Sequence, residues 1–136
     1  MNDFTCVVFI SGTGSNLRAI LEAIEKGALA GVKVAAVIAD VDAPGLSFAR
    51  DRGIPAHVVT LADYSTREDW NRALVDCTAH YAPDLVVLAG FMRLLGAPML
   101  EAFQGRIINT HPALLPAFPG AHGVRDALNY GVKVTG

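Results

Sequence analysis

An asparagine and a histidine two residues apart are the side chains of this sequence best suited to catalysis. Asn109 and His111 follow an apolar run, and a segment with three prolines and a glycine comes after them. Prolines cannot continue a helix or an inner strand, so the pair is expected at the carboxyl end of a strand, with both side chains pointing the same way. An open α/β sheet holds its ligand crevice at that end. An amide that stabilises an oxyanion, beside an imidazole that moves protons, suits acyl transfer. The alternative is a pair of loop side chains that only satisfy hydrogen bonds.

A glycine-containing turn follows the first apolar run, at Gly12-Thr13-Gly14-Ser15-Asn16. Free backbone N–H groups and a helix dipole would make this turn an anion site, and phosphate is the natural ligand. A tight turn that binds nothing is the alternative. A dinucleotide is a weaker candidate, because Asp40 stands where a ribose-binding acid could lie but Leu17 replaces the third glycine. A Walker loop is excluded, since no Gly-Lys-Ser/Thr follows.

A third segment, Gly90-Phe91-Met92-Arg93-Leu94-Leu95, follows another apolar run and is expected in the same crevice. Its exposed main chain and apolar side chains could clamp a flat heteroaromatic ring through backbone hydrogen bonds. The alternative is ordinary packing, since Met and Phe at a strand end commonly belong to the core.

Five apolar runs predict the strands that position these segments, the first of them central to the sheet. The predicted strands are residues 4–10, 32–39, 56–59, 84–89 and 106–109. Helices are predicted from Ser15 to Gly27, over 45–52, between Ser65 and Pro83, over 97–103 and over 124–130. Strands and helices that alternate with short connections favour an α/β fold with a doubly wound, mostly parallel sheet.

Two helix starts carry capping signals. Ser15 is the predicted N-cap of the first helix, and Ser65 with Glu68 is the predicted capping box of the third. The third helix should turn an apolar stripe inward, made of Trp70, Ala73, Leu74, Cys77 and Tyr81.

The last residues, 132–135, are β-branched and predict the beginning of another strand. No linker or repeat divides the sequence, so residues 1–136 are expected to form a single domain. Because the sequence stops within this predicted strand, we expect that domain to be incomplete at its carboxyl end.

Composition narrows the classes of partner. Of the 136 residues 52% are hydrophobic and 18% charged, and the net charge of −2 gives no electrostatic reason to bind nucleic acid or an anionic membrane. Small molecules are the expected partners. Cys6 and Cys77 show no metal-site or disulfide spacing and are expected as free thiols. The sequence shows neither a basic leader nor a run long enough to span a membrane, which predicts a cytoplasmic protein.

Three segments together resemble the phosphoribosylglycinamide formyltransferases, the folate-dependent enzymes of purine biosynthesis. They are ISGTGSN from Ile10, LAGFMRLL from Leu88 and INTHPALLPAFPGAHG from Ile108. The resemblance runs in order along all 136 residues and implies a Rossmann-like formyltransferase fold. The first segment is the one that points to this member of the wider formyltransferase superfamily.

The resemblance also implies roles for single residues. Gly14, Ser15 and Asn16 would hold the phosphate of 5'-phosphoribosylglycinamide. The formyl donor, 10-formyltetrahydrofolate, would be held by Arg67, Met92, Arg93, Leu94, Leu95 and Asn109. Asn109 would hydrogen-bond the formyl oxygen and His111 would assist proton transfer, with no metal.

One family residue has no counterpart here. The resemblance implies an aspartate that orients the histidine and lies later in the sequence than Gly136, and Asp126 matches no catalytic position. The resemblance also implies a cis peptide bond between Leu115 and Pro116. Two further functions remain open: a formyltetrahydrofolate deformylase, with water as the acceptor, and a nucleotide-binding module without turnover.

Overall fold

A parallel five-stranded sheet is the centre of the computed structural model, which describes residues 3–136. The strands are β1 (Phe4–Ile10), β2 (Val32–Ala39), β3 (Ala56–Val58), β4 (Leu85–Leu88) and β5 (Ile107–Asn109). They lie in the order β3-β2-β1-β4-β5, and every neighbouring pair is parallel. The prediction that the first strand is central is therefore confirmed.

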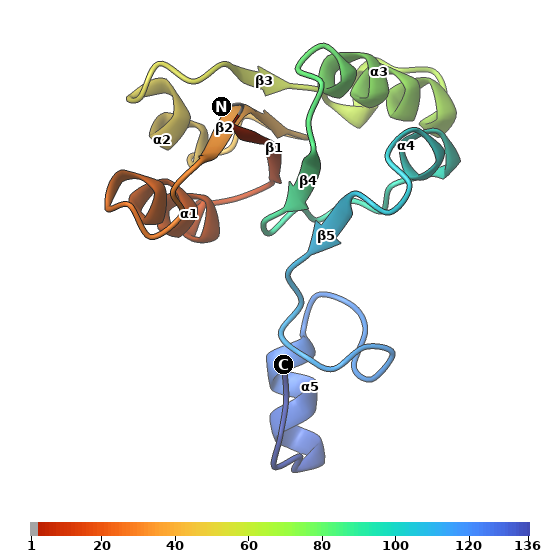
Figure 1. Cartoon of the computed structure of the whole chain (residues 1–136). Helices are drawn as coiled ribbons and strands as arrows, with labels where there is room; N and C mark the ends of the chain where they lie inside the picture. Colours follow the sequence, from red (N-terminus) through yellow and green to blue (C-terminus); the bar gives the residue numbers. More distant parts are fainter. Residues whose placement is uncertain (1–2) are drawn as a thin grey trace.

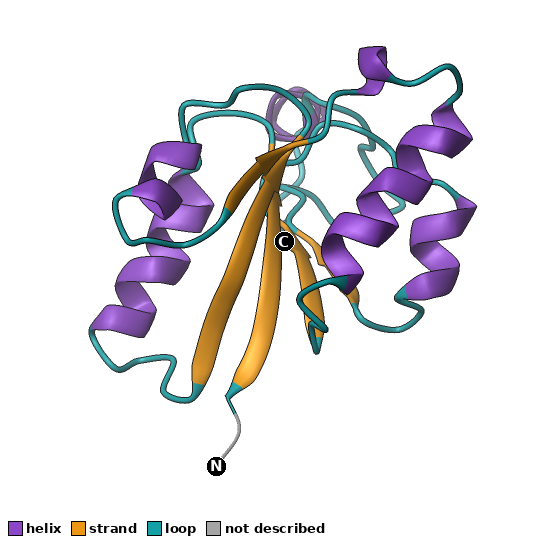
Figure 2. Cartoon of the chain, turned by 90° about the horizontal axis from the view of Figure 1, so that it is seen from above, coloured by secondary structure: helices purple, strands orange, loops and turns teal. Residues whose placement is uncertain are grey.

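Helices cover both faces of this sheet (Figures 1 and 2). The helices are α1 (Ser15–Glu25), α2 (Leu46–Arg50), α3 (Arg67–Ala79), α4 (Ala97–Ala102) and α5 (Gly123–Tyr130), with a short 3₁₀ turn η1 (Leu61–Asp63). In Figure 1 α1 and α2 lie on one side of the sheet, and α3 and α4 lie on the other. The doubly wound α/β fold is confirmed.

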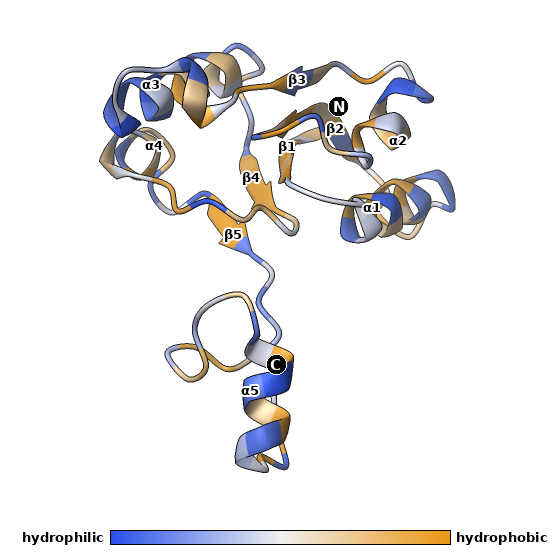
Figure 3. Cartoon of the chain, turned by 180° about the vertical axis from the view of Figure 1, so that it is seen from behind, coloured by the Kyte–Doolittle hydropathy of each residue, from blue (hydrophilic) through white to orange (hydrophobic). Residues whose placement is uncertain are grey.

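Alternate side chains of β1 enter two separate cores. Val8 and Ile10 pack with α1 and α2, whereas Val7 and Phe9 pack with α3 and α4, and all four are fully buried. A strand buried on both faces needs apolar residues pointing to both, which explains the nearly continuous apolar run of its sequence. Figure 3 shows β1 and β4 as largely hydrophobic and shows hydrophilic residues on the outward turns of α1 and α3.

The strand order puts a topological switch point between β1 and β4. From β1 the chain moves outward through β2 to β3, and it then returns to the other side of β1 as β4 and β5. The loops after β1 and β4 therefore leave the sheet in opposite directions, and ligands of open α/β sheets bind at such a switch point.

Both predicted caps are wrong by one residue. Gly14, in the left-handed conformation with φ of 74°, is the N-cap of α1, and Ser15 is the first helical residue. Thr66 rather than Ser65 caps α3, since its hydroxyl accepts a hydrogen bond from the Asp69 backbone N–H at 3.0 Å. Two neighbouring residues of similar capping ability cannot be ranked from local sequence alone.

The predicted inward stripe of the third helix is confirmed in part. Trp70 and Leu74 are fully buried, while Cys77 and Tyr81 are half-buried against the same core. The stripe also omitted Asn71, which is 2% exposed.

The carboxyl-terminal segment lies below the sheet in Figure 1 and contains the proline-rich loop and α5. Residues 132–135 form no strand, so that prediction is wrong; the Thr135 hydroxyl instead donates to the Pro112 carbonyl at 3.3 Å. The Leu115–Pro116 peptide bond is cis, as the resemblance implied. Within residues 3–136, no helix is both long and apolar enough to cross a membrane.

Candidate functional site

The glycine turn and the Asn-x-His segment meet at the carboxyl end of the sheet. The Asn16 side-chain amide donates to the Thr110 hydroxyl at 3.5 Å. The Thr110 backbone N–H donates to the Leu88 carbonyl at 3.2 Å, which continues the β4–β5 ladder. Because Thr110 lies between Asn109 and His111, the loop predicted to bind phosphate adjoins the pair predicted to be catalytic.

Close packing of two glycines shapes the turn before α1. Gly14 lies against Gly45, the residue before α2, so closely that a Cβ on Gly14 would stand 2.8 Å from the Gly45 Cα. The Gly45 N–H donates to the Gly12 carbonyl at 3.0 Å. Ser15 and Asn16 are exposed, and the first turn of α1 carries no acidic residue. The N-terminal amides of α1 therefore form a positive, accessible end that suits an anion.

The segment after β4 combines packing with exposure. Phe91 is buried and packs edge-to-face on Phe9, with ring centroids 5.3 Å apart, and it is stacked on Trp70 at 6.3 Å. In contrast Met92 is 71% exposed and Leu94 is 82% exposed. The packing alternative thus holds for Phe91 and fails for Met92 and Leu94. Two exposed apolar side chains of one loop can contact a flat ring.

Arg67 reaches this loop from the first turn of α3. Its guanidinium Nη2 donates to the Leu94 carbonyl at 3.4 Å, and its Cζ lies over the Trp70 ring, 5.8 Å from the centroid. Asn71, one helical turn later, accepts a hydrogen bond from the Gly96 N–H at 2.6 Å. Arg67, which its place in the first turn of a helix would put in solvent, therefore lies next to the exposed loop.

Asn109 and His111 differ in their surroundings. Asn109 ends β5, opposite Leu88 of β4, and is exposed. His111 is half-buried, and its Nε2 lies 2.8 Å from the Phe118 carbonyl oxygen. A carbonyl only accepts, so Nε2 donates this hydrogen bond and Nδ1 is the ring nitrogen left for proton exchange. Gly123 packs closely against the ring, since a Cβ there would lie 3.2 Å from Nε2.

The carboxylate of Asp40, which the sequence analysis considered as a possible ribose ligand, is buried next to the loop after β4. Asp40 is 4% exposed and accepts hydrogen bonds from the Ser11 hydroxyl at 2.6 Å and from Arg93 Nε at 3.3 Å. The same Ser11 oxygen accepts from the Met92 N–H at 2.8 Å. A carboxylate so buried and engaged cannot hold a ribose, which removes the main support for a dinucleotide. Ser11 carried no signal apart from its place directly after a strand.

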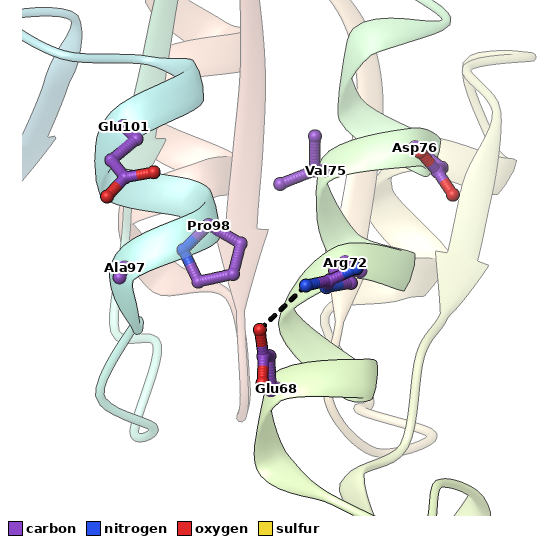
Figure 4. Close-up of a pocket in the computed structure, with 7 residues that line it drawn as sticks. All are labelled: Glu68, Arg72, Val75, Asp76, Ala97, Pro98 and Glu101. Carbon is purple, nitrogen blue, oxygen red and sulfur yellow. Dashed lines mark hydrogen bonds and ion pairs between the residues drawn. The ribbon is translucent and has the colours of Figure 1, made fainter.

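A surface hollow of about 580 Å³ lies between α3 and α4 (Figure 4). Glu68 and Arg72 line it and form an ion pair at 2.7 Å, and this contact raises the pKa of the Arg72 guanidinium above its ordinary value. None of the predicted catalytic or ligand-binding residues lines this hollow. The candidate site therefore lies at the carboxyl ends of the strands and not in this hollow.

Comparisons with known proteins identify the family to which the chain is similar. The family model described as "Formyl transferase" matches residues 5–136. The phosphoribosylglycinamide formyltransferase of Mycobacterium tuberculosis is 52% identical over 130 residues, which are 96% of this chain and 60% of that protein. The Escherichia coli protein of the same name is 44% identical over 92% of this chain and 59% of its own length. The chain thus spans about three fifths of the length of these relatives.

Solved structures of two relatives have the same fold as this chain. Glycinamide ribonucleotide transformylase 1 from Symbiobacterium toebii superimposes with a TM-score of 0.91 at 47% identity, covering 98% of this chain and 63% of that one. The phosphoribosylglycinamide formyltransferase from Coxiella burnetii gives a TM-score of 0.89 at 41% identity, with coverage of 96% and 61%.

Proposed function

Since this chain belongs to the formyl transferase family, we propose that its protein transfers a formyl group from 10-formyltetrahydrofolate to the amine of 5'-phosphoribosylglycinamide, in purine biosynthesis. The observation that carries the proposal is the hydrogen bond between Asn16 and Thr110, because it joins an anion site to an acyl-transfer pair. A phosphorylated amine and a formyl donor can meet only where those two features adjoin. The names of the relatives support this choice of substrates.

The two substrates divide the crevice between them. The phosphate lies on the backbone amides of Gly14, Ser15 and Asn16 at the start of α1, where the helix dipole favours negative charge. The folate ring lies against the loop after β4, between exposed Met92 and Leu94. Its negatively charged tail extends toward Arg67, which is held beside that loop by the Leu94 carbonyl. The reacting amine and formyl carbon then meet near Asn109 and His111.

The reaction needs no covalent bond to the protein. The amine nitrogen of the ribonucleotide attacks the formyl carbon, a carbon–nitrogen bond forms, and the formyl oxygen becomes an oxyanion. The Asn109 amide donates a hydrogen bond to this oxyanion. Removal of such a donor lowers kcat by about 10²–10³-fold. His111 carries the proton from the attacking amine to N10 of the folate through Nδ1. The bond from the formyl carbon to N10 then breaks and releases tetrahydrofolate.

The deciding experiment measures tetrahydrofolate release by the full-length natural protein, with and without the ribonucleotide. We expect release only when the ribonucleotide is present, with one formylated ribonucleotide formed per tetrahydrofolate. Release of formate and tetrahydrofolate in its absence would identify a deformylase. Calorimetric binding of the ribonucleotide, with neither turnover nor folate binding, would identify a nucleotide-binding module.

A further inference from the structure

Hydrogen bonds connect the ends of β1 and β2 with the loop after β4. They involve the side chains of Asp40, Ser11 and Arg93 and the backbone N–H of Met92. Asp40 follows β2 directly, Ser11 follows β1 directly, and Met92 and Arg93 belong to the loop itself. The Asp40 carboxylate accepts from Ser11 with one oxygen and from Arg93 with the other, at 2.6 and 3.3 Å. The Ser11 hydroxyl in turn accepts from the Met92 N–H at 2.8 Å. Two successive loop residues are therefore tied to the sheet through one carboxylate.

The direction of these bonds makes Asp40 the organising member. A carboxylate can only accept hydrogen bonds, so the Ser11 hydroxyl must donate its single proton to Asp40. Its lone pairs are then left to accept the Met92 N–H. Without Asp40 the hydroxyl would be free to rotate, and nothing would orient its lone pairs toward the loop.

The loop itself has the character of a segment that needs such an anchor. Gly90, at its start, has φ of 78°, and both Met92 and Leu94 expose most of their side chains. The next tethers lie further along the loop, where the Leu94 carbonyl accepts from Arg67 and the Gly96 N–H donates to Asn71. Asp40 and Ser11 therefore fix the half of the loop that lies nearest β1.

We propose that Asp40, acting through Ser11 and Arg93, is a positioning residue that sets the affinity for the formyl donor without contacting it. The proposal rests on the proposed function, because it needs the loop after β4 to hold the folate. Asp40 is too deeply buried to touch a ligand, so its influence passes through the loop backbone. The phosphate turn uses other contacts, between Gly14 and Gly45, and should not respond.

The test compares the Michaelis constants of both substrates in variants of the full-length protein. Ser11→Ala removes the acceptor of the Met92 N–H, and we expect the KM for 10-formyltetrahydrofolate to rise about tenfold, the effect of one hydrogen bond. Asp40→Asn keeps an oxygen for Ser11 but loses the charge that holds Arg93, so a smaller rise of about threefold is expected. The ribonucleotide KM should stay within about twofold in both.

A matched control and a rescue separate positioning from general stability. Asp42→Asn makes the same chemical change two residues later, at a side chain that is 85% exposed and forms a 3.8 Å pair with Arg50, and it should change neither KM. Ser11→Thr keeps the hydroxyl and should restore the folate KM, while Ser11→Ala does not. A merely structural role would lower the unfolding temperature and leave the ratio of the two KM values unchanged.

Calorimetry with tetrahydrofolate, together with the formyl-transfer assay, separates a failure of the proposed function from a failure of the role given to Asp40. If the unmodified protein binds no tetrahydrofolate and transfers no formyl group, the proposed function fails. If the unmodified protein binds tetrahydrofolate and transfers the formyl group, the role proposed for Asp40 can be judged by itself. It is overturned if folded Ser11→Ala and Asp40→Asn proteins keep the folate KM, or if their two KM values rise equally.

Discussion

Gly45→Ala should weaken ribonucleotide binding, although Gly45 belongs to no recognised binding segment. A Cβ at this position would lie 2.7 Å from the Gly14 Cα, 2.8 Å from the Gly14 N and 2.9 Å from the Thr13 carbonyl carbon. Contacts this short do not persist, so one of the two backbones must move. The φ of Gly45 is −62°, which alanine adopts without strain, so the substitution tests close approach alone.

The magnitude follows from overpacking and from the displaced amides. Overpacking lowers the free energy of unfolding by about 1–3 kcal/mol. For a chain of this size each kcal/mol lowers the unfolding temperature by about 2–8 °C. The Gly14 N–H is one of the proposed phosphate donors, and a hydrogen bond to a charged group contributes about 1.5–3 kcal/mol. Its displacement should raise the ribonucleotide dissociation constant roughly 10–150-fold.

Calorimetric titration of the full-length protein with the ribonucleotide measures this change, and tetrahydrofolate binding serves as the internal reference. Gly53→Ala is the matched control, because Gly53 follows the same helix, has φ of 67° and would meet nothing within 4 Å. We expect it to cost about 1–2 kcal/mol of stability through the left-handed conformation and to leave ribonucleotide affinity unchanged. A folded Gly45→Ala protein that binds the ribonucleotide like the unmodified protein would refute the assignment of the phosphate to this turn.

Three further outcomes follow from single contacts. His111→Asn should lower kcat by at least about 100-fold while calorimetry still detects both substrates, and a near-normal kcat would remove the proton-transfer role. Trp70→Phe leaves the buried Val59 carbonyl without the indole donor now 2.8 Å away, so chemical denaturation should show a loss of about 1–3 kcal/mol; an unchanged midpoint would contradict this. Burial, with a smaller effect of nearby Asp84, raises the pKa of the Cys6 thiol, so less thiolate exists at pH 8 and iodoacetamide should modify Cys6 more slowly in the folded than in the unfolded protein. Equal rates in the two states would count against that burial.

Much of the fold could be predicted because its signals are local. The strand at Phe4–Ile10 is apolar except at Thr5, which is typical of a strand covered on both faces, so its central place could be predicted. The run at residues 132–135 shows the limit of the same reasoning. Its valines have β-propensity, yet Val134 is 76% exposed and the run pairs with no strand among residues 3–136. Propensity becomes a strand only where a partner strand supplies the hydrogen bonds.

The candidate site also contains residues whose positions could be predicted from local sequence and residues whose positions could not. Asn109, His111 and the turn at Gly14 could be predicted because each residue type suits its chemistry at a strand end. Gly45 could not, since its role is to let another backbone approach, and the approaching segment lies some thirty residues earlier in the chain.

Asp40 is the instructive case, because its place after a strand could be predicted from the sequence and its hydrogen-bond partners could not. A carboxylate directly after a buried strand is equally consistent with a ribose ligand and with an internal anchor. The sheet order distinguishes them: with β1 between β2 and β4, the residues that directly follow three adjacent parallel strands must converge at one edge. Ser11 then lies between Asp40 and the loop that carries Met92 and Arg93, and the short serine bridges them. Both oxygens of the carboxylate therefore accept hydrogen bonds within the protein, and Asp40 supports the loop after β4.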